Sequence, residues 1–234
     1  LTRDKVMALS DGIIYGALSI VFGYLIAWLM VKVLKVRRGR RGVFINTIVN
    51  ANTIFIGLPL NIALFGEASM PYFLVYYVLN TVSTWAFGAF LIANDSTEPQ
   101  PAHRQKFNWK KLLPAPLLGF LVALVFLLAD IPVPSFIHST LDYVGSIVTP
   151  LSLLYIGITL ADAGLKSIRF DKDTIAALLG KFVLAPLIMV ALIVAGHHIW
   201  PLPSLEAKTL MVQASVSALA VLPILANEAK GDVR

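Results

Sequence analysis

The sequence predicts an all-helical protein that is embedded in a lipid bilayer. Of its 234 residues, 58% are hydrophobic and only 14% are charged, whereas a soluble domain has about 25% charged residues. This excess of apolar surface needs lipid, so a soluble globular enzyme is excluded. Seven apolar blocks are each long enough to cross the hydrocarbon layer as a helix of about 20 residues. They cover approximately 11–35, 43–65, 70–93, 112–131, 141–164, 173–196 and 205–228.

Basic residues are concentrated in alternate loops between these blocks. Lysines and arginines lie in 32–41, 104–111 and 166–172, whereas the intervening loops have almost none. Loops rich in Lys and Arg stay in the cytoplasm, so the first block runs from outside to inside. The formal charge of +6 therefore indicates an anchor at lipid headgroups rather than a nucleic-acid surface. We expect a multi-pass protein of the cell membrane.

Two blocks share a cluster of small polar residues followed by a proline. Val49–Asn52 precedes Pro59, and Val212–Ser215 precedes Pro223 at nearly the same spacing. The two blocks lie five spans apart, which is an odd number, so they have opposite orientations in the membrane. Inverted repeats of this kind are typical of secondary transporters.

The repeat predicts how the chain is organised. Residues 1–93 would be the last three helices of a first five-helix repeat, 94–111 a cytoplasmic connecting loop, and 112–234 the first four helices of a second repeat. We therefore expect seven helices of a ten-helix transporter, with two helices before Leu1 and one after Arg234. A complete seven-helix protein is the alternative, because small-residue patterns are common in membrane helices.

A proline inside a helix removes a hydrogen bond and breaks or kinks the helix. The exposed N–H groups of the following half-helix carry a partial positive charge that suits a carboxylate. Asn50, Asn52, Gln213 and Ser215 would add hydrogen bonds beside the breaks. In the alternative interpretation, these side chains only join helices to one another.

The segment Asn52–Leu60 (NTIFIGLPL) resembles the NTxxxGxPL segment of the auxin efflux carrier family. That family includes plant PIN carriers and bacterial malate and malonate permeases. Asn80 stands where the family has a polar residue, often Gln. Val212–Ala214 with Pro223 resembles the family's second crossing segment.

The resemblance implies two inverted five-helix repeats whose broken helices cross at the substrate site. It also implies proton-linked or potential-driven movement of a small organic anion by a bundle that slides against a scaffold. Ser217, where plant members usually have a proline, and the short loop at 94–111 favour a dicarboxylate such as malate or malonate over an auxin-like acid. The expected substrate-site residues are Asn50, Asn52, Gly57, Pro59, Asn80, Gln213, Ser215 and Pro223.

Lys181 lies about eight residues inside the sixth block. An ionisable residue at this depth is a functional candidate because its burial is costly. It could balance a substrate carboxylate or carry a coupling proton, or its ammonium could extend to the cytoplasmic surface. Asp11 and Asp173 open their blocks, where helix capping is the simplest role. The resemblance gives Asp11 a minor role in proton coupling.

Other chemistries find no support in the sequence. It contains no cysteine, and the adjacent His197 and His198 make a poor pair of metal ligands. The motifs of known hydrolases are missing, so we expect no metal, cofactor or enzymatic activity. The expected partners are a small organic anion and the bilayer; the oligomeric state, including a homodimer, stays open. The alternatives are a sodium-coupled symporter of bile-acid-carrier architecture and, less favoured, a membrane sensor or intramembrane hydrolase.

Overall fold

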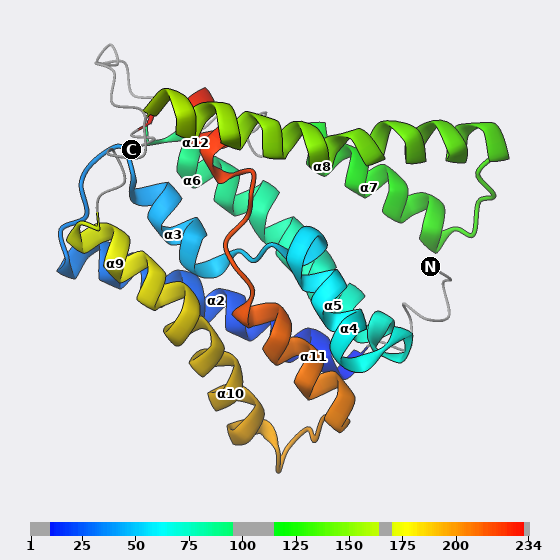
Figure 1. Ribbon diagram of the computed structural model, residues 1–234. Coiled ribbons are helices and arrows are strands. Elements are labelled where there is room, and N and C mark those ends of the chain that lie inside the picture. Colours follow the sequence, from blue (N-terminus) through cyan, green and yellow to red (C-terminus); the bar gives the residue numbers. More distant parts are fainter. Residues whose placement is uncertain (1–9, 96–114, 164–169, 232–234) are drawn as a thin grey trace.

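The computed structural model describes residues 10–95, 115–163 and 170–231, and the regular elements in these ranges are helices (Figure 1). A helix or a pair of helices lies in each of the seven predicted apolar blocks. The prediction of an all-helical protein is therefore confirmed for the described residues.

Three segments are long and apolar enough to cross a membrane as continuous helices. The first is α2 (Ser10–Val33). The others are built from consecutive turns that differ in winding. One contains η2 (Glu67–Ser69), α5 (Met70–Val82), η3 (Ser83–Gly88) and α6 (Ala89–Ala93), and the other contains α9 (Lys172–Leu179), η6 (Gly180–Leu184) and α10 (Ala185–Gly196).

Two other segments are interrupted. In the first, α3 (Arg41–Val49) is followed by an extended stretch at 50–52, by η1 (Thr53–Gly57) and by α4 (Leu58–Phe65). In the second, α11 (Ser204–Ser215) and α12 (Leu222–Glu228) are separated by non-helical residues 216–221.

The sequence analysis expected the helices to break at the prolines, but the interruptions lie upstream of them. Pro59 and Pro223 occupy the first turns of α4 and α12. Proline is well tolerated there because the first N–H groups of a helix have no partner within the helix. Pro223 thus lies at the start of the second half-helix, whereas η1 precedes Pro59, and both breaks lie upstream of the prolines.

The remaining helices, α7 (Ala115–Leu128) and α8 (Ser135–Ala163), form a hairpin. α7 contacts η3, whereas the turn between the two helices lies away from the other helices (Figure 1). α8 begins earlier than the predicted block at 141–164. The side chains described along this hairpin are exposed.

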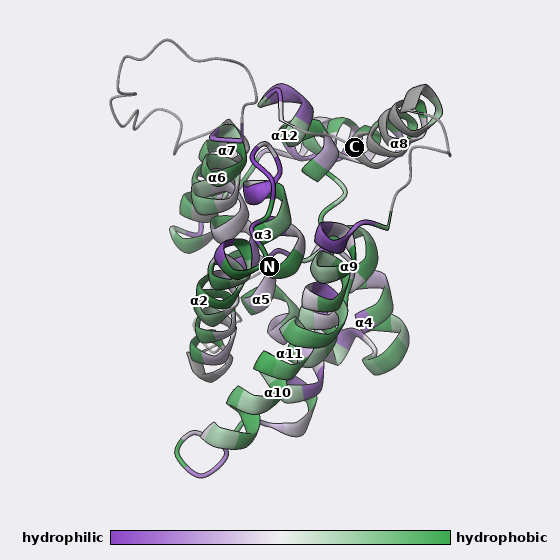
Figure 2. Cartoon of the chain, turned by 90° about the vertical axis from the view of Figure 1, so that its left-hand side faces the viewer, coloured by the Kyte–Doolittle hydropathy of each residue, from purple (hydrophilic) through white to green (hydrophobic). Residues whose placement is uncertain are grey.

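The other helices pack around α2, which contacts α3, α5 and α10. One apolar core lies between α2, α3 and α9, and a second surrounds the point where the interrupted segments meet. Hydrophobic residues predominate along the long helices, and hydrophilic ones gather near helix ends such as the start of α9 (Figure 2). Large apolar side chains such as Leu25, Trp28 and Leu187 are more than half exposed, as expected for a surface in contact with lipid.

Candidate functional site

The two interrupted segments meet at their non-helical stretches. Ala51 and Ala218 form an isolated antiparallel bridge, and the Asn52 N–H donates a hydrogen bond of 2.8 Å to the Ser217 carbonyl. The backbone of each segment leaves the helical conformation here, so its peptide groups need partners from elsewhere. We call this contact the crossing.

Asn80 on α5 supplies two of those partners. Its Oδ1 accepts a 2.8 Å hydrogen bond from the Ala51 N–H, and its Nδ2 donates a 2.9 Å bond to the Ala51 carbonyl. Both residues are buried. The predicted site residue Asn80 therefore holds the backbone of the crossing through both of its amide atoms.

Gln213 on α11 reaches across to η1. Its Nε2 donates a 3.0 Å hydrogen bond to the Gly57 carbonyl. A Cβ atom on Gly57 would lie 2.2 Å from the Gln213 Oε1, so this approach requires glycine. The Oε1 itself is buried without a hydrogen-bond partner among the described residues.

Asn52 and Ser215 lie at the ends of half-helices. The Asn52 Oδ1 accepts a 3.2 Å hydrogen bond from the Phe55 N–H and caps η1. This cap occupies one of the N–H groups that the sequence analysis assigned to a carboxylate. The Ser215 hydroxyl donates to the Met211 carbonyl of its own helix at 2.6 Å.

Asn50 belongs to a different network. Its Nδ2 donates to the Asn46 Oδ1 at 2.6 Å and to the Tyr24 hydroxyl at 3.2 Å, and its Oδ1 accepts from the Ser83 hydroxyl at 2.7 Å. Asn50 is fully buried, and these bonds join α2, α3 and η3. The structure thus gives Asn50 the helix-joining contacts of the alternative interpretation. The sequence analysis did not single out Asn46, although it lies one helical turn before Asn50.

Lys181 lies inside the protein. It is 1% exposed, and its Nζ has no hydrogen-bond partner among the described residues. The expectation that its ammonium could extend to the cytoplasmic surface is therefore wrong. Gly180, beside it in η6, packs against Ile48 of α3, so the lysine is held in a tightly packed region.

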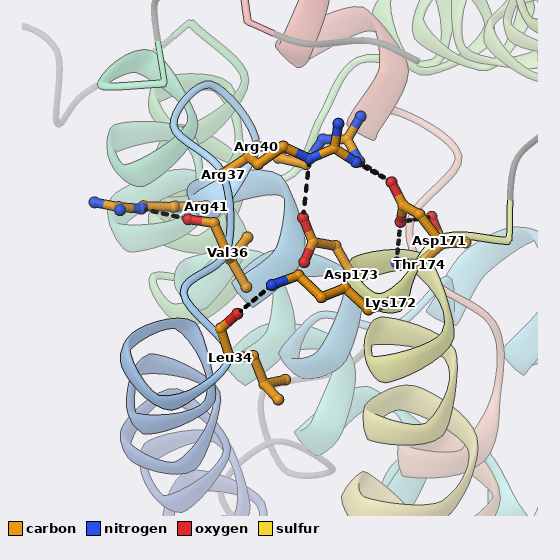
Figure 3. Close-up of polar contacts among 9 residues, drawn as sticks. All are labelled: Leu34, Val36, Arg37, Arg40, Arg41, Asp171, Lys172, Asp173 and Thr174. Carbon is orange, nitrogen blue, oxygen red and sulfur yellow. Dashed lines mark hydrogen bonds and ion pairs between the residues drawn. The ribbon is translucent and has the colours of Figure 1, made fainter.

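Charged residues connect the loop after α2 with the start of α9 (Figure 3). Arg37 pairs with Asp171 and lies 3.5 Å from Asp173, and Arg40 lies 3.0 Å from Asp171. The basic run, predicted only as a topology anchor, therefore also joins the two halves of the chain.

Asp171 is the residue that caps α9. Its Oδ1 accepts hydrogen bonds from the backbone N–H and the hydroxyl of Thr174. The backbone bond, with help from the hydroxyl and from nearby Arg40 and Arg37, lowers the pKa of Asp171 below its ordinary value. Asp173, for which the sequence predicted this capping role, lies in the first turn instead.

A cavity of about 340 Å³ lies between α3, α9 and α12, next to the crossing. Arg40, Thr47 and Asp173 contribute polar groups to its wall, and Ala218 and Pro223 come from the second interrupted segment. Asp173 is 2% exposed, and its Oδ1 has no hydrogen-bond partner among the described residues. The other lining residues are Val43, Phe44, Thr174, Ala177, Leu178, Leu219, Leu222 and Ala226.

Two candidates of the sequence analysis remain. The side chain of Asp11 lies outside the described residues. The rings of His197 and His198 lie edge to face with centroids 5.5 Å apart. No cluster of His, Asp or Glu suited to a metal ion occurs in the part of the chain that the structure describes.

A family model described as membrane transport protein matches residues 5–230, which include both interrupted segments. A search of curated proteins finds no match.

Proposed function

The chain belongs to the membrane transport protein family, which is the auxin efflux carrier family, and we propose from this premise that it is a secondary transporter of a small organic anion. Membership of the family makes the protein a membrane transporter rather than an enzyme. We further propose that its fold is a ten-helix inverted repeat, of which this chain supplies seven helices.

The observation that carries the proposal is the crossing of two interrupted segments at Ala51 and Ala218. Discontinuous helices that meet inside a membrane are tolerated where they face protein or a watery cavity. They also present backbone groups and helix ends to a substrate, as in other secondary transporters.

We assign different roles to the predicted site residues: some support the backbone of the crossing, and another contacts the substrate. Asn80 and Gln213 hold the crossing backbone through hydrogen bonds. Asn52 caps η1 through its Oδ1, and its Nδ2 is a further hydrogen-bond donor. We assign this Nδ2 to the substrate carboxylate. Pro59 and Pro223 keep the half-helices in place, and Ser215 lies at the end of α11 in the second interrupted segment.

Lys181 is the proposed coupling group. An ionised ammonium that is buried without a partner is costly in free energy. Its charge is therefore tolerated only with a compensating anion, or else the side chain releases its proton. In the first case the anion compensates the charge of the lysine as it binds, and in the second case the lysine releases a proton. Transport of the anion is thereby coupled to movement of charge or of protons.

The membrane potential determines in which direction the anion moves without a coupled ion. Outward movement of one negative charge down a negative-inside potential releases about 2.3 kcal/mol per 100 mV. Export of an organic anion thus needs no ion partner, whereas uptake needs cotransported protons.

Counterflow of labelled malate or malonate into proteoliposomes that contain the full-length protein tests this function. The Asn52→Ala variant should lose most of the counterflow. Asn94→Ala is the matched control, because Asn94 is exposed and its side chain donates a hydrogen bond to the nearby Phe90 carbonyl of α6. Equal counterflow in both variants would refute the role of the crossing, and no counterflow of any organic anion by the unaltered protein would refute the function.

Sodium coupling is the second candidate, and one observation favours it. The buried oxygens Asn61 Oδ1, Thr209 Oγ1 and Gln213 Oε1 have no hydrogen-bond partner among the described residues. They lie on α4 and α11, which pack together, and oxygens of this kind are ligands of hard cations. Uptake that requires sodium and fails in potassium would support this alternative.

A further inference from the structure

A cavity of about 630 Å³ lies between α2 and the segment formed by α5, η3 and α6. Its lining is mostly apolar, and part of that lining reaches the surface. Val21, Leu25 and Trp28 on α2 and Phe87 on η3 all line the cavity and are more than half exposed. The cavity is therefore open on the outer side of these helices, where exposed apolar surface meets lipid. We call it the lateral groove.

The lateral groove is as long as one leaflet of a bilayer. Along α2 it extends from Ala17 to Trp28, which is about 16 Å at 1.5 Å per residue. Half of a hydrocarbon core of about 30 Å is about 15 Å. The basic residues that follow α2 place the Trp28 end toward the cytoplasm. The groove thus lies within the depth of the cytoplasmic leaflet.

A cation stands at the cytoplasmic end of the groove. Lys32 lies one helical turn after Trp28, and its Nζ is 3.4 Å from the centre of the Trp28 ring. This cation–π contact keeps the ammonium beside a residue that lines the groove. Lys32 is exposed and makes no ion pair among the described residues, whereas Arg37 and Arg40 of the following loop pair with Asp171. Lys32 can therefore bind an anion at the membrane surface.

The inner wall of the groove reaches the polar network around Asn50. Tyr24 and Ser83 both line the groove. The Tyr24 hydroxyl donates to the Ser83 carbonyl at 3.2 Å and accepts from the Asn50 Nδ2 at 3.2 Å. An apolar chain in the groove keeps water away from these hydrogen bonds, which are stronger where the dielectric constant is low. An occupant of the groove should therefore stabilise the contacts among α2, α3 and η3.

We infer that the lateral groove binds a phospholipid with an anionic headgroup from the cytoplasmic leaflet. One acyl chain lies between α2 and η3, and the phosphate lies beside Lys32. The apolar lining suits the chain, and an ammonium is a common ligand of phosphate groups. A headgroup of net negative charge is favoured over a zwitterionic one, because it brings no cation of its own close to the lysine. The inference depends on the orientation of α2 and not on the transported substrate.

Thermal unfolding of the delipidated full-length protein tests this inference. Anionic phosphatidylglycerol should raise the unfolding temperature more than zwitterionic phosphatidylcholine does, because a lipid that binds the folded state stabilises it. Lys32→Gln should weaken the apparent affinity for phosphatidylglycerol about fivefold, as expected for one cation near the membrane surface. Arg38→Gln is the matched control and should change this affinity much less, because it removes the same charge from an exposed position on the following loop. Equal stabilisation by the two lipids, or equal losses in the two variants, would overturn the inference.

A photo-crosslinking residue at the edge of the groove identifies the occupant directly. Leu25 lines the groove, Leu187 lies on α10, and both are 57% exposed, so the two positions form a matched pair. In proteoliposomes with equal amounts of the two lipids, benzoylphenylalanine in place of Leu25 should capture phosphatidylglycerol preferentially. The same residue in place of Leu187 should capture both lipids alike.

Two outcomes at Leu25 would overturn the inference. One is capture of a protein segment, from the same chain or from a second copy, and the other is capture of both lipids without preference. Both measurements detect lipid binding alone. Failure of anion counterflow would therefore refute the transport function and leave this inference intact, and unselective lipid binding with intact counterflow would do the reverse.

Discussion

Gln213 and Gly57 are 156 residues apart in the chain, yet the Gln213 Nε2 lies 3.0 Å from the Gly57 carbonyl. This hydrogen bond connects the first half of one interrupted segment with the second half of the other. It lies beside the backbone bond between Asn52 and Ser217. The side chain of Gln213, in the second half of the chain, thus bonds to the glycine of the NTIFIGLPL segment in the first half.

Replacing Gly57 tests this relationship. In Gly57→Ala, the new Cβ would meet the Gln213 Oε1 at 2.2 Å, so the glutamine must move and its hydrogen bond is lost. We expect a loss of about 1–3 kcal/mol in the free energy of unfolding and reduced counterflow. Thermal unfolding in detergent measures the first effect. In a Gln213→Ala background the same glycine substitution should have a much smaller effect, and an undiminished effect there would contradict the contact.

Asn80 should be important for stability because it bonds two buried backbone groups. In Asn80→Ala, the N–H and carbonyl of Ala51 lose their partners, and each unsatisfied group has a cost of about 1–3 kcal/mol. We expect a lower unfolding temperature together with loss of counterflow. Asn94→Ala, at an exposed position, is the control and should behave as the unaltered protein.

Asn50 and Asn52 should respond differently although they are only two residues apart. Asn50→Ala removes the centre of a buried network and should mainly lower the unfolding temperature. Asn52→Ser should mainly weaken apparent substrate affinity, because Ser can also cap a helix but lacks the amide Nδ2. Concentration dependence of counterflow and thermal unfolding, measured on the same preparations, separate the two effects. Similar profiles for both residues would contradict the assignment.

Lys181 should control the dependence of transport on voltage or protons. Lys181→Met keeps a long side chain but removes the buried charge, so the fold should be retained or stabilised. We expect counterflow without the response to an imposed potential or pH gradient that the unaltered protein shows. A potassium diffusion potential across proteoliposomes provides the measurement, and an unchanged response would exclude the lysine from coupling.

Asp171 should contribute to stability in a pH-dependent way. Its pKa is lowered in the folded protein, relative to about 3.9 in an unfolded chain. Its ionised form therefore stabilises the fold fully above that value, and this contribution is lost as the pH falls through the lower, folded pKa. Asp171→Asn keeps the cap but removes the charge, so its unfolding temperature should fall less between pH 5 and pH 3. Asp142→Asn alters an exposed residue on α8 whose partner is the equally exposed His138, and it should change the acid dependence much less, because exposed ion pairs contribute little to stability.

Much of the architecture follows from local composition. Long apolar blocks interrupted by basic loops predict membrane helices because lipid requires about 20 apolar residues per span. The helices lie where these blocks predicted them, with α8 beginning earlier, at Ser135. The NTIFIGLPL segment and the two prolines also indicated the family, which the family model confirms.

What each polar side chain does was decided by the tertiary structure. Asn50 ends one helix and faces α2 and η3, whereas Asn52 begins η1 after the chain has left the helix, so their spacing could not predict their directions. Lys181 is buried because α3 and the neighbouring helices enclose η6, and the basic loop pairs with Asp171 because α9 begins beside it. The sequence by itself determined that the chain lies in a membrane and where its spans run, since hydrophobicity and helix breaking are local properties. Only the tertiary structure decided which backbone and side-chain groups meet, because those contacts join residues of different helices, 29 positions apart for Ala51 and Asn80 and 156 for Gln213 and Gly57.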